Sequence, residues 1–232
     1  MKYLLDPLKV KRQLEQQGYF IPVFEFAETL HNIAFAAMGK DLPSDEVLRH
    51  SQKALDLISQ VDGHTNDHTR FLFCRGLALY FAHRNAEALA VFEGVYQTCT
   101  GTFGALSSQA RDAGYAVGFL LYTMGRPSEA QAFVEGCLIR GKEQAGLLWP
   151  KECRTRAKYL YSLILLALGN IGSGDRLRDE AIRELKGHLV AAFPGTLPTE
   201  LNAALSFTDD LVGFEVFGSV VPFFAGRFDV YH

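Results

Sequence analysis

The sequence lacks the features that mark several large classes of protein. It has no basic block, and its formal net charge is −3, which argues against a nucleic-acid-binding surface. Its first residues contain no apolar run of the kind that a secretory signal needs. The longest uncharged window near the end, residues 216–226, is too short to span a bilayer. We therefore expect a cytoplasmic protein with no transmembrane segment and no nucleic-acid partner.

Motifs for catalysis or metal binding are also missing. No nucleophile and base stand at a recognisable spacing. His64 and His68 are four residues apart, as zinc ligands on a helix can be, but a third ligand is not in evidence and a capping loop explains them better. No CxxC pair occurs, and the wide spacing favours buried, reduced thiols for all four cysteines, Cys74, Cys99, Cys137 and Cys153. The sequence predicts no catalytic residue, no metal and no cofactor, so an enzyme is the less favoured class.

Most of the chain is instead filled by apolar residues at helical spacing. Glycine, proline and capping residues separate the predicted helices. These cover residues 6–17, 21–38, 44–58, 70–83, 84–99, 107–124, 126–139, 149–168 and 175–189. In the third of them we expect a buried stripe of Val47, Leu48, Ser51, Ala54, Leu55 and Ile58. We expect Asn66 or Asp67 to cap the fourth helix, residues 100–104 to form a loop, and residues 170–174 to form a flexible insertion.

Four turn positions recur at a nearly constant interval. They are Gly39, His83, Gly125 and Gly169, separated by 44, 42 and 44 residues. Seven residues before each turn stands a compact residue, namely Asn32, Gly76, Gly118 and Ser162. Five and nine residues after two of the turns stand Ala88 and Phe92, then Ala130 and Val134, which we expect to be buried between hairpins. A fixed period with matching residue classes indicates a solenoid of helix pairs.

The residues around the third turn carry a family resemblance. The pattern Gly118-x2-Leu121-x3-Gly125-x4-Ala130-x3-Val134-x2-Cys137 resembles a tetratricopeptide repeat, and residues 76–95 follow the same pattern. The period is similar to the long variant of kinesin-light-chain-like arrays. The resemblance covers roughly residues 21–189 and implies an all-α fold, a right-handed superhelical array of antiparallel helix hairpins. The fourth hairpin fits only if seven residues are looped out, which would put Ala181 in the place of Ala88 and Ala130.

This resemblance divides the chain into three parts. Residues 1–20 form an N-terminal extension, and residues 21–189 form the repeat domain. Residues 190–232 contain a short helix and an apolar segment dense in valine and phenylalanine. A segment of this composition has to be covered, so it caps the last hairpin, lies in the groove or pairs with a second subunit.

Four positions on each first helix face the concave groove in tetratricopeptide repeats. The resemblance therefore implies a groove lined by Arg70, Phe73, Leu77, Tyr80, Asp112, Tyr115, Phe119, Tyr122, Arg156 and Tyr159. The same positions hold Leu163 and Leu166 in the fourth hairpin, and Phe26, Thr29, Ile33 and Ala36 in the first. Aromatic rings give large contact areas at low entropic cost, and arginine adds a planar donor for acidic groups. Alternatively, these side chains only pack the interior of the superhelix.

Three functions are compatible with such a groove. The first is a scaffold or binding module that holds a peptide or protein segment, including one with an acidic group. The second is a sensor or enzyme for a bulky, apolar small molecule in the same cavity. The third is a homodimeric assembly protein that associates through its apolar C-terminal segment. We favour the first, because protein binding is the commonest use of such arrays and no catalytic motif appears.

Overall fold

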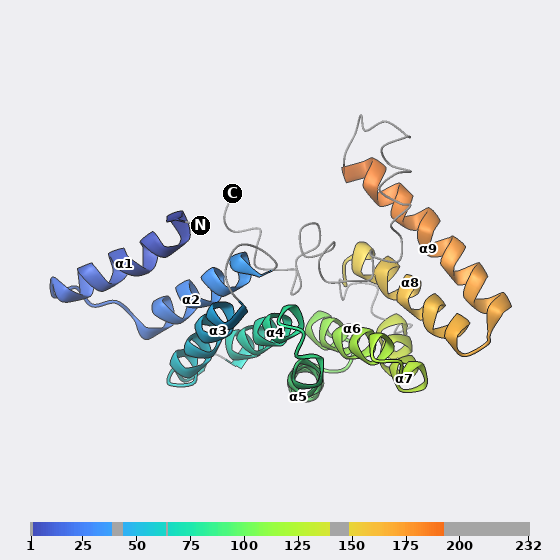
Figure 1. Cartoon of the computed structure of the whole chain (residues 1–232), viewed down its shortest axis with the longest axis horizontal. Helices are drawn as coiled ribbons and strands as arrows, with labels where there is room; N and C mark the ends of the chain where they lie inside the picture. Colours follow the sequence, from blue (N-terminus) through green and yellow to red (C-terminus); the bar gives the residue numbers. More distant parts are fainter. Residues whose placement is uncertain (1, 39–43, 64, 140–148, 193–232) are drawn as a thin grey trace. The chain divides into compact units, whose positions relative to one another are not determined.

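The computed structural model describes residues 2–38, 44–63, 65–139 and 149–192 (Figure 1). Over these ranges the chain is all-helical and contains no strand. It divides into two compact units, Met1–Val95 and Tyr96–His232. The predicted C-terminal segment from residue 193 onward and the first turn at Gly39 lie outside the described residues.

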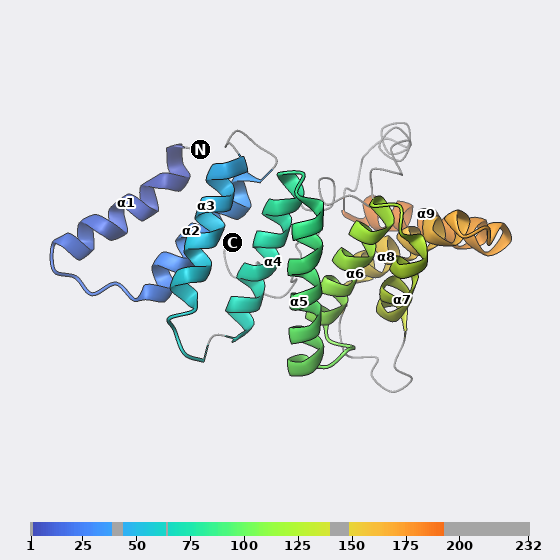
Figure 2. The same cartoon turned by 60° about the horizontal axis from the view of Figure 1, so that its bottom comes forward.

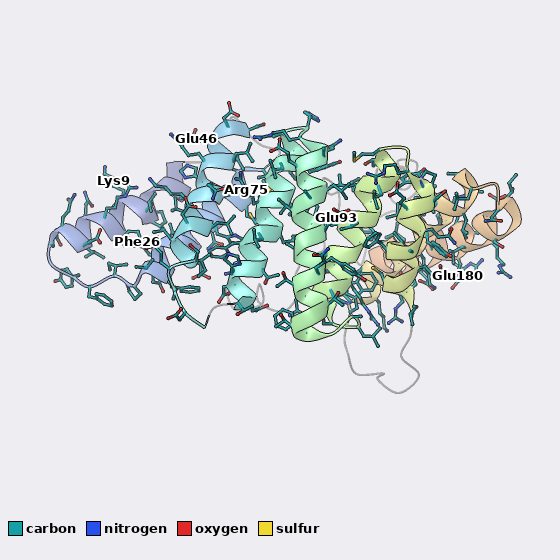
Figure 3. The ribbon with its side chains drawn as sticks, turned by 90° about the horizontal axis from the view of Figure 1, so that it is seen from below. Lys9, Phe26, Glu46, Arg75, Glu93 and Glu180 are labelled. Atoms are coloured by element: carbon teal, nitrogen blue, oxygen red, sulfur yellow. The ribbon has the colours of Figure 1, made fainter. Side chains whose placement is uncertain are left out.

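The first unit contains α1 (Lys2–Gln16), α2 (Val23–Ala37), α3 (Ser44–Ile58), α4 (Thr65–Phe81) and the first part of α5 (Asn85–Phe103). Consecutive helices pack together, and α2, α3 and α4 lie side by side in Figure 2. Arg75 on α4 reaches α3, where its Nη1 donates to the carbonyl of Leu48 at 3.2 Å (Figure 3). The predicted apolar stripe of α3 is buried in full: Val47, Leu48, Ser51, Ala54, Leu55 and Ile58.

The second unit contains the rest of α5, then α6 (Ser108–Thr123), α7 (Pro127–Leu138), α8 (Lys151–Ala167) and α9 (Ile171–Ala192). Helix α6 packs on α7, α7 on α8 and α8 on α9. Lys158 joins α8 to α9 through ion pairs of 2.6 Å with both Glu180 and Glu184 (Figure 3). No helix among the described residues combines the length and the apolar character needed to cross a membrane.

One turn geometry recurs at His83, Gly125 and Gly169, as predicted. These residues have positive φ angles of 58°, 74° and 82°. In each turn the N–H of this residue donates to the carbonyl three residues back, and the next N–H donates to the carbonyl five residues back. This pair of hydrogen bonds is the Schellman motif, which ends a helix and reverses the chain. The three turns are therefore equivalent in backbone conformation as well as in sequence position.

A glycine on the first helix allows two of the hairpins to close tightly. A Cβ added to Gly76 would lie 2.6 Å from Cε1 of Phe92, and one added to Gly118 would overlap Cγ2 of Val134. Side chains in a close-packed interior do not approach so closely, so these two sites require glycine. The predicted burial is confirmed for Ala88, Phe92, Ala130 and Val134, which have no exposed surface. Phe92 and Val134 lie against the glycine of their own hairpin.

The fourth hairpin contradicts the predicted insertion at residues 170–174. Helix α9 begins at Ile171, so residues 171–174 are helical and nothing is looped out. Gly174 stands five residues after Gly169, in the place that alanine takes in the second and third hairpins. A Cβ on Gly174 would lie 3.1 Å from the carbonyl oxygen of Ser162. In the fourth hairpin the glycine of the close contact is therefore on the second helix, whereas in the second and third hairpins it is on the first helix.

Ala181 has a different place from the one predicted for it. It is buried, with 1% of its surface exposed, and stands twelve residues after Gly169. The equivalent residues in the second and third hairpins are Val95 and Cys137, both of which are also buried. Without an insertion, the fourth hairpin therefore follows the same numbering as the two before it.

Three predicted boundaries are also corrected. Helix α1 begins at Lys2, so Pro7 lies inside it and does not open it. Helix α4 begins at Thr65, which puts Asn66 and Asp67 in its first turn and not at its cap. Helix α5 continues through residues 100–103, which were predicted to form a loop, and Gly104 follows it with a φ of 86°.

Candidate functional site

The ten residues predicted to line a groove differ in exposure. Seven of them are buried, with 2–4% of their surface exposed: Phe73, Leu77, Asp112, Tyr115, Phe119, Arg156 and Tyr159. Arg70, Tyr80 and Tyr122 are partly exposed. The residues on α4 belong to the first unit, whereas those on α6 and α8 belong to the second. We therefore describe the two sets separately.

Exposure follows position in the repeat at two of the four predicted groove positions. Three residues before the compact residue, the side chain is buried in all four hairpins, at Thr29, Phe73, Tyr115 and Tyr159. Four residues after it, the side chain is partly exposed in all four, at Ala36, Tyr80, Tyr122 and Leu166. One residue after it, Leu163 is partly exposed, whereas the other three residues, Ile33, Leu77 and Phe119, are buried. Six residues before it, Phe26 and Arg70 are partly exposed, but Asp112 and Arg156 are buried.

Asp112 and Trp149 form a buried hydrogen bond in the second unit. The Trp149 indole Nε1–H donates to Oδ1 of Asp112 at 2.8 Å, and both residues are nearly inaccessible, at 4% and 3% exposed. Trp149 immediately precedes Pro150, the N-cap of α8, and Asp112 lies on α6. The hydrogen bond therefore connects the start of α8 to α6. A carboxylate acceptor strengthens such a bond in a low-dielectric interior.

Arg156 and Tyr115 form a second buried contact between α8 and α6. The guanidinium carbon of Arg156 lies 4.5 Å from the centroid of the Tyr115 ring, a cation–π arrangement. Tyr115 in turn stacks on Phe119, with ring centroids 6.5 Å apart and planes 7° from parallel. Burial raises the pKa of Tyr115 to about 12, although Arg156 opposes this shift. The phenol therefore stays protonated and is not a general base at neutral pH.

Arg111 belongs to the same region but was missed by the groove prediction. Its Nη2 donates to the carbonyl of Ile139 at 3.1 Å, and its guanidinium lies 5.8 Å from the Trp149 ring. Burial lowers the pKa of Arg111. The groove positions leave this residue out, because it precedes Asp112 by one residue on α6. The sequence signal that could have found it is the charged pair Arg111-Asp112 inside an otherwise apolar helix. Charged side chains that are buried in a protein are usually paired with another group.

The four cysteines are buried free thiols, in keeping with their sequence context. Burial raises the pKa of the Cys74 thiol to about 12. It also raises the pKa of the Cys137 thiol, and the Asp112 carboxylate adds to this shift. A thiol must ionise to act as a nucleophile, so neither residue is suited to that role. No group of three or more histidine, cysteine and acidic residues among the described residues could hold a metal ion.

In the first unit, the predicted groove residue Arg70 is engaged by two carboxylates. Its Nη2 lies 3.4 Å from Oε1 of Glu28 and 3.5 Å from Oδ1 of Asp67. Its guanidinium also lies 5.1 Å from the centroid of the Phe71 ring. An acidic ligand would have to compete with both carboxylates for this arginine. Phe73, on the same helix, packs against Phe92 at a ring distance of 4.9 Å.

His31 lies beside this cluster and is expected to make the stability depend on pH. It stacks on Phe71 at 4.4 Å, and burial together with Arg70 lowers its pKa to about 3. An unfolded histidine has a pKa of about 6.5, so between these values the unfolded chain binds a proton that the folded chain does not. The free energy of unfolding should therefore fall as the pH falls from 6.5 towards 3, by up to about 1.4 kcal/mol per pH unit from this residue.

The variant His31→Phe tests this expectation, because it keeps an aromatic ring against Phe71 but cannot take up a proton. Urea unfolding of the wild type and the variant would be compared at pH 7, 6, 5 and 4.5. The difference in their unfolding free energies should change steeply below pH 6.5 and little above it. A constant difference over the whole range would mean that His31 does not resist protonation in the folded state.

The chain matches no protein-family model and no curated protein. Its function is therefore inferred from the repeated turns and the exposure of the residues around them.

Proposed function

We propose that this protein is a tetratricopeptide-like binding module that holds a peptide or protein segment against the first helices of its hairpins. The observation that carries the proposal is the repeated Schellman turn at His83, Gly125 and Gly169, with its period of 42 and 44 residues. Each turn joins two antiparallel helices, and stacked hairpins of this kind form right-handed superhelices with extended binding surfaces.

Within this proposal, the contact residues are those that keep exposed surface in the folded chain. Tyr80 and Tyr122 stand four residues after the compact residue and are partly exposed. Tyrosine is enriched among residues that dominate binding energies, because its ring is large and rigid and its hydroxyl forms hydrogen bonds. The buried residues on the same helices hold the helices in position. Leu166 has the equivalent place in the fourth hairpin and provides an apolar contact.

The second function, a small-molecule sensor or enzyme, has less support. It requires polar groups that face a ligand. In the second unit, however, Asp112 bonds to Trp149, Arg111 to the main chain, and Arg156 stacks on Tyr115. Contacts of this kind hold neighbouring helices together. We therefore do not propose this second function.

Peptide selection on the full-length protein tests the binding module. Peptides would be selected from a random phage-displayed library on the immobilised wild-type chain, and their affinities measured by fluorescence anisotropy. Tyr80→Ala or Tyr122→Ala should weaken the selected peptides at least about tenfold, as expected for residues that contribute 1.4 kcal/mol or more. Tyr19→Ala is the matched control, because Tyr19 is 62% exposed and lies outside the hairpins. Equal affinity for all three variants would refute the proposal.

A further inference from the structure

We propose that α1 is the resident occupant of a helix-docking site on α2, and that the site also accepts a partner's amphipathic helix with a leucine and a lysine three residues apart. The inference deepens the proposed function by naming the chemistry of a partner. It rests on the proposed function, because the repeat numbering identifies Thr29 and Ile33 as groove positions. From the sequence, residues 1–20 were predicted only to be an N-terminal extension.

A single lysine supplies the polar part of the contact. Lys11 Nζ donates to Oε2 of Glu25 at 2.6 Å, to the carbonyl oxygen of Glu25 at 2.9 Å and to Oγ1 of Thr29 at 2.9 Å. An ammonium group has three N–H donors, so this set satisfies it completely. The Thr29 hydroxyl donates in turn to the carbonyl of Glu25 at 2.8 Å, which leaves its lone pairs for the lysine. The site is therefore built for an ammonium group.

Leu8 supplies the apolar part. It stands three residues before Lys11, on the same face of α1. It is buried, at 8% exposed, in one apolar cluster with Ala27, Leu30 and Ile33 of α2. Leu8 and Lys11 thus present an apolar anchor and a cation to neighbouring turns of α2. This is the pattern by which an amphipathic helix is recognised in a groove.

The attachment of α1 to α2 is slight over residues 7–16, the part of the helix whose side chains the structure describes. Among its described side chains, Pro7 to Gln16, Leu8 alone is buried, and Lys11 and Leu14 are partly exposed. The Lys11–Glu25 pair keeps 24% and 45% of its side-chain surface exposed, and ion pairs with that much solvent contribute little net binding. The connection to α2 is also exposed, up to 88% at Phe20. A helix held in this way can be displaced by a competitor of the same chemistry.

The length of the linker between α1 and α2 sets the affinity and concentration that a competing helix needs to displace α1. A short connection keeps α1 at an effective concentration of roughly millimolar beside its site, and a partner helix has to exceed this. Weakening α1 itself, or lengthening the linker, should therefore raise the affinity of the site for a helix added in trans. This result distinguishes a displaceable occupant from a helix that is part of the core.

The probe is a fluorescent peptide of residues 2–17, added to full-length protein and followed by anisotropy. The full-length variant Leu8→Ser/Lys11→Ser should bind it at least about tenfold more tightly than the wild type, because the resident helix is weakened. A second variant keeps α1 intact and inserts a twelve-residue Gly-Ser linker between the exposed residues Tyr19 and Phe20. It should also bind the peptide more tightly than the wild type, and it keeps the hydrogen bond from the Tyr19 N–H to the carbonyl of Leu14.

Charge exchange identifies the site. Glu25→Lys in the weakened variant puts like charges together and should weaken binding of the wild-type peptide, and a peptide carrying Lys11→Glu should recover part of the loss. Failure of both the weakened and the lengthened variants to bind the peptide, or equal binding by the wild type, would overturn the inference. So would concentration-dependent dimers of the lengthened variant in sedimentation, since α1 of a second copy would then be the occupant. Because Tyr80 and Tyr122 are not used here, the outcome is independent of the test of the proposed function.

Discussion

Replacing Phe92 by alanine is expected to lower the free energy of unfolding by about 3–5 kcal/mol, the range for a buried phenylalanine. The side chain has no exposed surface. Its ring contacts Phe73 at 4.9 Å and lies where a Cβ on Gly76 would have to be. Since α4 and α5 meet through this ring, its loss opens a cavity between them. Urea unfolding followed by circular dichroism measures the change.

Two further variants test whether the loss of stability in Phe92→Ala is caused by the loss of the buried ring between α4 and α5. Phe103→Ala removes a phenylalanine from the same helix that is 36% exposed, and it should cost less than about 1 kcal/mol. Gly76→Ala should cost about 1–3 kcal/mol in the wild type through overpacking, but much less when Phe92 is already alanine. Additive effects of the two substitutions would show that the added methyl group and the ring do not compete for the same space.

The fold could be predicted from the sequence where a strong local signal agrees with the packing. The stripe of α3 was predicted residue by residue, because its apolar side chains keep to one face and its charged ones to the other. The turns at Gly125 and Gly169 were predicted because glycine adopts the left-handed conformation without strain. His83 was found only from the period, since nothing in its chemistry distinguishes it from a helical residue.

The fourth hairpin was predicted wrongly because the rule that we used was too narrow. We looked for alanine five residues after the turn and a compact residue seven residues before it, and the fourth hairpin lacked the alanine. The packing requires only that one of the two helices carry the smaller residue. Ser162 and Gly174 meet this requirement with the sizes reversed. A search for a small sum of side-chain volumes across the contact would have found the correct match without an insertion.

Sequence position was a weaker guide to the candidate site. The family resemblance predicts which face of a helix a residue lies on. The exposure of that residue, however, depends on the side chains that pack against it from other parts of the chain. Tyr115 contacts Arg156, and Asp112 contacts Trp149, and in both cases the partner is more than 30 residues further along the chain. Such contacts are tertiary, and no local pattern encodes them. Tyr80 and Tyr122 keep exposed surface, and the binding proposal therefore depends on them.

The second large effect is expected at Trp149, the only tryptophan of the chain. Trp149→Ala should lower the free energy of unfolding by about 3–5 kcal/mol, since it removes a buried indole between α6 and α8. Ile171→Ala is the control in the same unit, because Ile171 is 62% exposed and should cost about 0.5 kcal/mol or less. Circular dichroism is the measurement here, because the variant loses the fluorescent residue itself.

A double-mutant cycle then separates the hydrogen bond from the packing. Trp149→Phe keeps most of the ring but removes the donor, and Asp112→Ala removes the acceptor. Because the acceptor is a carboxylate, the coupling energy between the two substitutions should be about 1.5–3 kcal/mol. In the Asp112→Ala single variant, the emission of Trp149 reports directly on the change around the indole. A coupling near zero would mean that the indole and the carboxylate do not depend on each other. Asp112 would then again be a candidate for ligand binding, as its position on α6 first indicated, whereas a large coupling assigns it to the core of the second unit.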